Sequence, residues 1–252
     1  MLRNPGPAGP RPCLESRPMT ELVQLPPLRL DRSRQVAPQV FEALRDLIVS
    51  VTLEPGTVLA RAELAEHYGI SQTPIRDALM RLGDEGLVDI FPQHATVVSR
   101  IDVDAALQAH FLRRAIELEI LVTACALPAG AHEALVAKLD DQLALQKAAL
   151  RRTDYDAFTA ADQAFHQAMY LAAGVPSLWD LVRQRSGHVD RLRRLNLPAR
   201  GKAQEVVADH EALLAALRAR DLAQATQALR KHLAGTLSFI DRIRESYPDW
   251  LG

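Results

Sequence analysis

Apolar residues recur at helical spacing through most of this 252-residue chain. Two short helical patterns meet at Gly69, because glycine adopts the left-handed backbone conformation of a helix end at little cost. The first pattern covers Arg61–Tyr68, and the second follows Ser71, with Pro74 in its first turn and Gly86 at its end. We therefore expect two helices joined by a tight turn. Their inward positions are Leu64, Ala65, Tyr68, Ile75, Ala78, Leu79 and Leu82.

After Gly86 the pattern changes to two short strands, residues 87–91 and 96–98, joined by a turn that contains Pro92. A further helix is predicted at about residues 38–50. Two helices followed by a β-hairpin form a winged helix-turn-helix, whose second helix can lie in the major groove of DNA. Two short helices alone are more often simple core packing, and the wing favours the DNA-binding interpretation.

Polar residues at the start of the second helix match the groups that DNA offers. Ser71, Gln72 and Thr73 can hydrogen bond to phosphates or base edges, and Arg76 follows one turn later. Arginine matches guanine O6 and N7, and glutamine matches adenine N6 and N7.

The run ELAEHYGIS-x-TPIRDAL-x-RL-x-x-EGLV resembles the winged-helix domain of the GntR family of bacterial transcription regulators. Gln72 replaces a common arginine, Arg61 replaces a common acidic residue, and His94-Ala95 replaces Arg-Gly at the wing tip. These departures leave the expected fold unchanged and leave the operator sequence open. The resemblance implies the following DNA-binding candidates: Arg61, Ser71, Gln72, Thr73, Arg76, His94 and Thr96.

The charge of this region bears on how it would bind DNA. Residues 36–100 contain five arginines and nine acidic residues, which gives a net charge of −4. Since non-specific DNA affinity comes largely from phosphate neutralisation, specific contacts and dimerisation would have to carry the binding. We expect a homodimer that reads an inverted repeat of double-stranded operator DNA.

Composition sets the remaining limits. Residues 1–33 contain seven prolines, and we expect a disordered or loosely attached tail. No run of about 18 apolar residues exists that could span a membrane. The two cysteines, Cys13 and Cys125, do not suggest a disulfide framework, so the cytoplasm is the expected compartment.

The chain after Ile101 is predicted to be entirely helical. The expected fold is therefore mainly α: a winged helix-turn-helix domain at 34–101, then a six-helix antiparallel bundle at 102–252. The expected helices cover about 102–126, 131–151, 154–173, 177–196, 203–219 and 221–246.

Four metal-ligand types fall on the apolar stripes of three of these helices. Asp162 and His166 are four residues apart on the third helix, His210 lies on the fifth and His232 on the sixth. Buried together, they would be costly unless something satisfied them, and three imidazoles with one carboxylate suit Zn²⁺, Ni²⁺ or Mn²⁺. The alternative is that each histidine is separately hydrogen bonded, which we favour for His67, His94, His110 and His132.

The D-x-x-x-H of Asp162 and His166 and the H-x21-H of His210 and His232 resemble the FCD effector domain of the FadR subfamily, in its VanR-like branch. This resemblance implies a divalent metal, most simply Zn²⁺, and a small organic acid bound beside it. Arg113, in an R-x-x-x-E pattern with Glu117, is the candidate for the acid, although it could equally form a plain salt bridge.

Two residues of the fourth helix, Arg185 and His188, share a face with leucines and are further effector candidates. His188 could also compete as a metal ligand. By contrast, Arg191, Arg193 and Arg194 resemble a solvated charge run.

Three functions are compatible with these features. The first is a metabolite-responsive, dimeric transcription regulator, expected to be a repressor. The second is a metal-dependent enzyme built on the bundle, since such a metal site could activate water. The third is a helical interaction module without a small ligand. We favour the regulator and expect no enzymatic activity, because no separate general acid or base accompanies the ligands and an enzyme would leave the winged domain unexplained.

Overall fold

The computed structural model describes residues 17–18, 25–92, 94–235 and 239–252. The chain divides into two compact units. The first comprises the described residues up to Ile48 together with Thr52–Arg100, and the second comprises Val49–Val51 and the described residues from Ile101 onward. None of the described helices is both long and apolar enough to cross a membrane.

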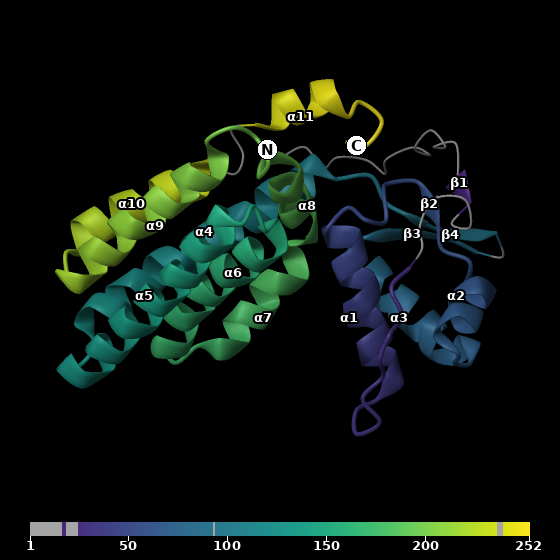
Figure 1. Cartoon of the computed structure of the whole chain (residues 1–252), viewed down its shortest axis with the longest axis horizontal. Coiled ribbons are helices and arrows are strands. Elements are labelled where there is room, and N and C mark those ends of the chain that lie inside the picture. The colour runs from purple at the N-terminus through teal and green to yellow at the C-terminus, as the bar shows by residue number, and fades with distance from the viewer. Residues whose placement is uncertain (1–16, 19–24, 93, 236–238) are drawn as a thin grey trace, which may run out of the picture. The chain divides into compact units, whose positions relative to one another are not determined.

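The first unit is a winged helix-turn-helix (Figure 1). Its β-strands form one sheet in the order β1-β2-β4-β3, in which β3 and β4 are antiparallel and form the wing. The elements are β1 (Arg17–Pro18), α1 (Val36–Val49), β2 (Thr57–Val58), α2 (Arg61–Tyr68), α3 (Gln72–Asp84), β3 (Val88–Phe91) and β4 (Ala95–Val98).

The turn between α2 and α3 forms as the sequence predicted. Gly69 has φ 62° and ψ 37°, and its N–H donates to the carbonyl oxygens of Ala65 and Glu66, which ends α2. Ser71 is the N-cap residue of α3, and Gly86 has φ 73° directly after that helix. Leu64, Ile75, Ala78, Leu79 and Leu82 are buried and hold the two helices together.

Most of the tail predicted at residues 1–33 lies outside the described residues. In its described part, Arg17–Pro18 pair in parallel with Thr57–Val58, and Leu25 is buried. Asp31 exchanges two hydrogen bonds with Gln39 of α1: its N–H donates to Gln39 Oε1 at 2.7 Å, and its carbonyl oxygen accepts from Gln39 Nε2 at 3.0 Å. These contacts attach the described part of the segment to the winged unit.

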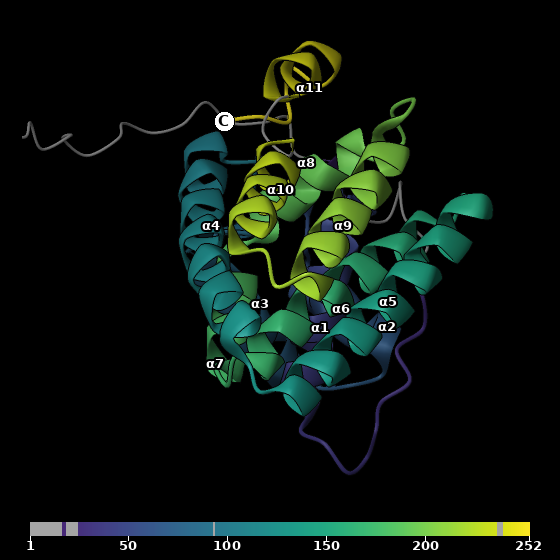
Figure 2. The ribbon, with the colours of Figure 1, turned by 90° about the vertical axis from the view of Figure 1, so that its left-hand side faces the viewer.

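The second unit is all α-helical (Figure 2). Helix α5 packs on α6 and α9, α9 packs on α10, and α4 contacts α6, α7, α8 and α10. The helices are α4 (Val103–Ala126), α5 (Ala129–Arg151), α6 (Tyr155–Ala172), α7 (Pro176–Arg185), α8 (Gly187–Asn196), α9 (Lys202–Arg218), α10 (Leu222–Ala234) and α11 (Ile240–Ser246).

Two of the six predicted helices are split. The predicted helix 177–196 breaks at Ser186, whose hydroxyl lies 3.1 Å from two acceptors, the Arg183 carbonyl oxygen and Asp190 Oδ2. Serine competes for backbone hydrogen bonds and the following Gly187 has low helix propensity, which explains the break. The predicted helix 221–246 is divided into α10 and α11, and residues 236–238 between them lie outside the described part.

The first residue of the helical unit pairs with the segment that follows α11, which the sequence did not predict. Ile101 forms a parallel bridge with Leu251: its N–H donates to the Trp250 carbonyl oxygen at 2.7 Å, and its carbonyl oxygen accepts from Gly252 at 3.0 Å. Ile101 and Leu251 are buried in a small core that also contains Ile243. The segment after α11 therefore holds the first residue of the helical unit in place.

Candidate functional site

The first candidate site is the exposed face of α3. Ser71, Gln72, Thr73 and Arg76 are all exposed, on the side of the helix opposite its buried residues. The Arg76 side chain is 59% exposed and lies 3.3 Å from Asp77 Oδ1. Ion pairs with this exposure contribute little to stability, so the Arg76 guanidinium can exchange Asp77 for a phosphate or a base edge.

Of the remaining DNA-binding candidates, Arg61 and His94 are exposed. Thr96 is not: it is 8% exposed and lies in β4 opposite Ile90. A side chain with so little exposed surface offers no group to DNA, so Thr96 leaves the set of candidate contacts.

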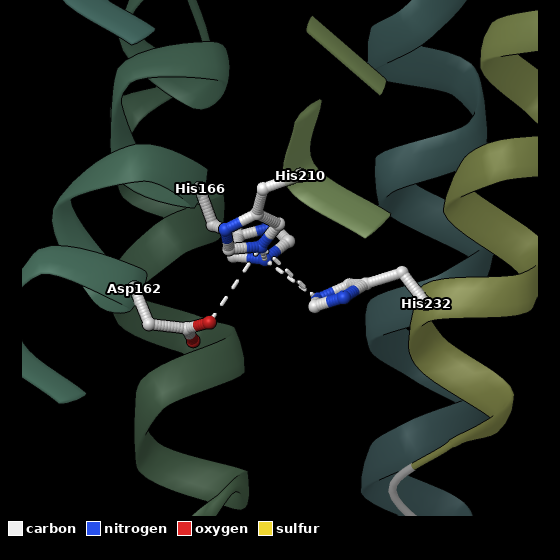
Figure 3. Close-up of side chains that lie close together, drawn as sticks. All are labelled: Asp162, His166, His210 and His232. Carbon is white, nitrogen blue, oxygen red and sulfur yellow. Dashed lines mark hydrogen bonds and ion pairs between the residues drawn. The ribbon is translucent and has the colours of Figure 1, made fainter. Parts of the chain in front are cut away.

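The second candidate site lies inside the helical unit, where four buried side chains from three helices converge (Figure 3). Asp162 and His166 come from α6, His210 from α9 and His232 from α10. His166 Nε2 lies 3.1 Å from His232 Nε2, and His210 Nε2 lies 3.3 Å from both. Asp162 Oδ1 is 3.6 Å from His210 Nε2. The structure thus brings together all four predicted ligands, whose ligand atoms lie within 4.8 Å of one another.

Polar residues behind the imidazoles determine which ring nitrogens carry protons. His210 Nδ1 lies 2.8 Å from Gln146 Oε1, which can only accept a hydrogen bond. Nδ1 therefore carries the proton, and His210 Nε2 presents a lone pair to the cluster. His166 Nδ1 lies 3.0 Å from Glu117 Oε2, which favours the same tautomer.

Burial sets the charge of the cluster. It lowers the pKa of His166, His210 and His232, for His210 to about 4, so all three imidazoles are neutral at pH 7. Burial alone would raise the pKa of Asp162, but nearby positive charges, above all Arg193, hold that pKa below its ordinary value. A carboxylate and three imidazole lone pairs therefore converge on one point.

Such a donor set could hold a divalent metal ion. With Zn–N bonds of 2.0–2.1 Å, ligand atoms at the corners of a tetrahedron are about 3.4 Å apart. The observed separations of 3.1 Å and 3.3 Å between the Nε2 atoms are close to this value. The three imidazoles therefore fit a metal ion in both chemistry and spacing, and the Asp162 carboxylate, 3.6 Å from His210 Nε2, fits it in chemistry.

Among the effector candidates, Arg113 lies beside this cluster. Its Nε donates to Glu117 Oε1 at 2.7 Å, and Glu117 Oε1 also accepts from the Tyr170 hydroxyl at 3.4 Å. The salt bridge is buried, and the charge of Arg113 influences the pKa of both Asp162 and His166. Arg113 therefore forms the salt bridge to Glu117 and also lies near the cluster.

The two other effector candidates lie elsewhere. His188 is buried, but its Nδ1 accepts the backbone N–H of Asp102 at 3.1 Å, and it is not among the four clustered ligands. Arg185 is exposed at the end of α7. Contrary to the prediction, Arg185 therefore does not share a face with the buried Leu192 of α8, because the break at Ser186 interrupts the helical phase between them.

Two polar residues beside the cluster, Gln146 and Arg193, were not predicted from the sequence. Gln146 is a polar residue on the apolar stripe of α5, a signal that could have identified it. Arg193 Nη1 lies 3.7 Å from Asp162 Oδ2. The prediction of a solvated charge run is wrong for Arg193 and also for Arg191, which is fully buried, and it holds for Arg194, which pairs with the exposed Asp156 at 2.6 Å.

Both units of the chain match families of known proteins. Residues 37–98 match the model of the bacterial regulatory proteins of the gntR family, and residues 108–235 match the FCD domain. A relative from Streptomyces ambofaciens, an HTH-type transcriptional regulator in an unstable DNA locus, is 37% identical over 83% of this chain and 87% of its own. The HTH-type transcriptional repressor RspR of Escherichia coli K12 is 28% identical over 88% of this chain and 96% of its own.

The fold is also that of a solved structure. Escherichia coli McbR/YncC superposes with a TM-score of 0.69 at 24% sequence identity, covering 85% of this chain and 99% of that one. RspR is named a transcriptional repressor, and the Streptomyces ambofaciens relative and McbR are named transcriptional regulators, in agreement with the function favoured from the sequence. The chain therefore belongs to the GntR family of bacterial transcriptional regulators, and its helical unit carries an FCD domain.

Proposed function

We propose that this regulator is a homodimeric repressor whose affinity for operator DNA is controlled by a small organic acid bound beside a metal ion. The observation that carries the proposal is the convergence of Asp162, His166, His210 and His232 in a chain that also contains a winged helix-turn-helix. We assign DNA binding to residues 34–101, and metal and effector binding to residues 102–252. Since DNA is the partner, we place the protein in the cytoplasm.

The DNA contacts that we propose combine the start of α3 with two flanking positions. Gln72 and Arg76 read base edges, because their side chains match adenine and guanine bidentately and both are exposed. Ser71 and Thr73 contact phosphates together with the N-terminal N–H groups of α3. Arg61 and His94 are the flanking contacts. The exposure of all six residues supports the proposal.

An exposed apolar stripe on α4 supports a homodimer. Leu107, Phe111 and Val122 share one face of this helix and are exposed, Phe111 by 64%, with the small Ala115 between them. Large apolar side chains grouped on one helix face favour association, because association removes them from water.

The charges beside this stripe suit a second copy of α4 in antiparallel orientation. A two-fold axis midway between residues 111 and 122 places Phe111 against Val122 of the second copy. The same axis places Arg114 against Glu119 of the second copy, because that pair has the same midpoint. An antiparallel pair of α4 helices would therefore bring apolar residues against apolar residues and opposite charges against each other, as suits a two-fold interface.

We propose Zn²⁺ as the most suitable ion, with Ni²⁺ and Mn²⁺ as alternatives, since three imidazoles and one carboxylate suit these metals. The ligands would be Asp162 Oδ1 and the Nε2 atoms of His166, His210 and His232. Bound there, the ion would supply a positive centre that attracts an acid group. The hydrogen bond to Gln146 holds His210 in the ligating tautomer, and the Glu117 carboxylate, 3.0 Å from His166 Nδ1, favours the same tautomer of His166.

For the effector we propose a small organic acid that contacts Arg113. A guanidinium offers five donors, so Arg113 can keep its hydrogen bond to Glu117 and still donate to a carboxylate. We no longer include Arg185, which is exposed, or His188, whose Nδ1 accepts a backbone hydrogen bond. The acid would alter DNA affinity only as far as it prefers one arrangement of the protein, and operator DNA would change its affinity by the same factor.

The DNA assignment is tested by footprinting with Arg76→Ala. We expect a loss of about 5- to 150-fold in affinity for the specific site, which corresponds to the 1–3 kcal/mol of a bidentate base contact. Arg81→Ala is the matched control, since Arg81 is exposed at the other end of α3 and lies over the Phe41 ring. Unchanged protection by Arg76→Ala would disprove its role.

The metal assignment is tested by elemental analysis of the purified protein. We expect about one divalent ion per chain, and loss of most of it in His210→Ala. His132→Ala is the matched control, because His132 is also buried but its Nε2 bonds to the Leu217 carbonyl oxygen. Equal metal content in both variants, or no uptake of Zn²⁺ or Ni²⁺ by the wild type, would show that the four side chains do not form a metal site.

A further inference from the structure

Arg193 lies at the proposed metal site, although its neighbours in sequence do not. Its Nη1 is 3.7 Å from Asp162 Oδ2, and its side chain is 23% exposed. Arg194, one residue later, pairs at 2.6 Å with Asp156, whose side chain is 79% exposed. Helix α8 therefore directs one guanidinium to the metal site and the next one to the surface.

The formal charges around Asp162 can be counted residue by residue. Asp162 and Glu117 are negative, and Arg113 and Arg193 are positive, so these four cancel. The three imidazoles add no charge when they bind a metal ion, because a ligating histidine is neutral.

Two further acidic groups near this site already have partners. Asp190 lies near Arg193 but forms a 2.7 Å salt bridge with Arg183. Asp209, behind His232, lies 2.7 Å from Lys231. A divalent ion bound by the four ligands would therefore leave this buried site with about two uncompensated positive charges.

Buried charge is costly unless it is compensated, and the least costly compensation here is an anion with two negative charges. We propose that the effector is a small dicarboxylate and that Arg193 is the residue that recognises its second carboxylate. This inference rests on the proposed metal and effector site. The first carboxylate faces the metal and Arg113. The second faces Arg193, whose planar guanidinium can donate to two oxygens.

Arg193 also makes the site selective for dicarboxylates over monocarboxylates. A monocarboxylate of the same length places a methyl group where the second carboxylate would lie. It therefore leaves one positive charge uncompensated and buries an apolar group against a guanidinium. We expect at least a tenfold preference for the dicarboxylate, which equals about 1.4 kcal/mol.

The test compares three pairs of acids of equal chain length: malonate with propionate, succinate with butyrate, and glutarate with valerate. Binding to the full-length, Zn²⁺-loaded protein, freed of excess metal, is measured by calorimetry, and metal content is determined in the same samples. The variants are Arg193→Gln, Arg193→Lys as the charge-retaining variant, and Arg194→Gln as the matched control.

We expect the wild type and Arg194→Gln to prefer at least one dicarboxylate by tenfold or more. Arg193→Gln should lose this preference with its metal content unchanged, and Arg193→Lys should keep part of it. Equal binding of the two acids in every pair, binding of none of the six, or an unchanged preference in Arg193→Gln would overturn the inference. Metal retention and operator binding in the same samples would leave the proposed metal site and DNA binding intact, whereas loss of both would refute the proposed function itself.

Discussion

Gln146 connects two of the proposed metal ligands, and its replacement gives a sharp test of the metal site. Its Oε1 accepts from His210 Nδ1 at 2.8 Å, and its Nε2 donates to Asp162 Oδ1 at 3.4 Å. Gln146→Leu removes both hydrogen bonds and leaves the four ligands in place. The buried Nδ1–H of His210 then has no acceptor from this residue, which costs about 1–3 kcal/mol.

The expected effect on metal binding follows from the position of Gln146 behind the ligands. Loss of such a supporting hydrogen bond weakens metal affinity about 10- to 100-fold, or roughly 1.4–2.7 kcal/mol. At a metal concentration far above the dissociation constant, the stabilisation by metal falls by the same amount, because the ion binds only the folded state. The Tm increase on adding Zn²⁺ should therefore be smaller in Gln146→Leu than in the wild type.

The assay is competition with a chromophoric zinc chelator, together with thermal unfolding with and without Zn²⁺. Gln142→Leu is the matched control: Gln142 is buried one turn earlier on α5, and the hydrogen bonds to His210 and Asp162 come from Gln146. A zinc affinity of Gln146→Leu within a factor of two of that of Gln142→Leu would refute the proposed arrangement of ligands and supporting residues.

Three further outcomes are expected. Burial lowers the pKa of His110 and His210 from 6.5 to about 4, so the unfolded protein binds more protons; the stability of chelator-treated protein in urea should fall as the pH decreases from 6.5 to 4, and a flat profile would contradict the burial of neutral imidazoles. Phe111→Glu should convert the proposed dimer to monomer in light scattering, whereas Leu145→Glu, at a leucine of α5 that is 57% exposed, should not; a dimeric Phe111→Glu variant would refute the proposed interface on α4. Ile75→Ala should destabilise the winged unit by about 2–5 kcal/mol, because Ile75 is fully buried between α3 and its neighbours; an unchanged urea midpoint would contradict this packing.

The elements that local signals specify could be predicted well. The turn between α2 and α3 depends on Gly69, whose left-handed conformation is a property of that residue and its immediate neighbours. The end of α3 depends in the same way on Gly86. Asp162 and His166 could be assigned to one face because an α-helix returns to the same side after four residues.

The candidate site was harder to predict where it depended on the phase of a helix or on a partner from another helix. The break at Ser186 interrupts the predicted helix 177–196, so Arg185 ends on the exposed side while Arg193 reaches Asp162. Ser186 and Gly187 are weak signs of such a break, because both residue types also occur inside helices and the apolar periodicity continues on both sides.

The wing shows the same limit for strands. Alternation places Thr96 and Val98 on one face of β4, but only packing decides which face is buried, and Thr96 is on the buried one. Likewise, Gln146 belongs to the site only because α5 packs against both α6 and α9. Which residue types could bind a metal is a matter of side-chain chemistry and is readable along the chain. Their distances, protonation and supporting hydrogen bonds arise between helices far apart in sequence, so they became known only once those helices were packed together.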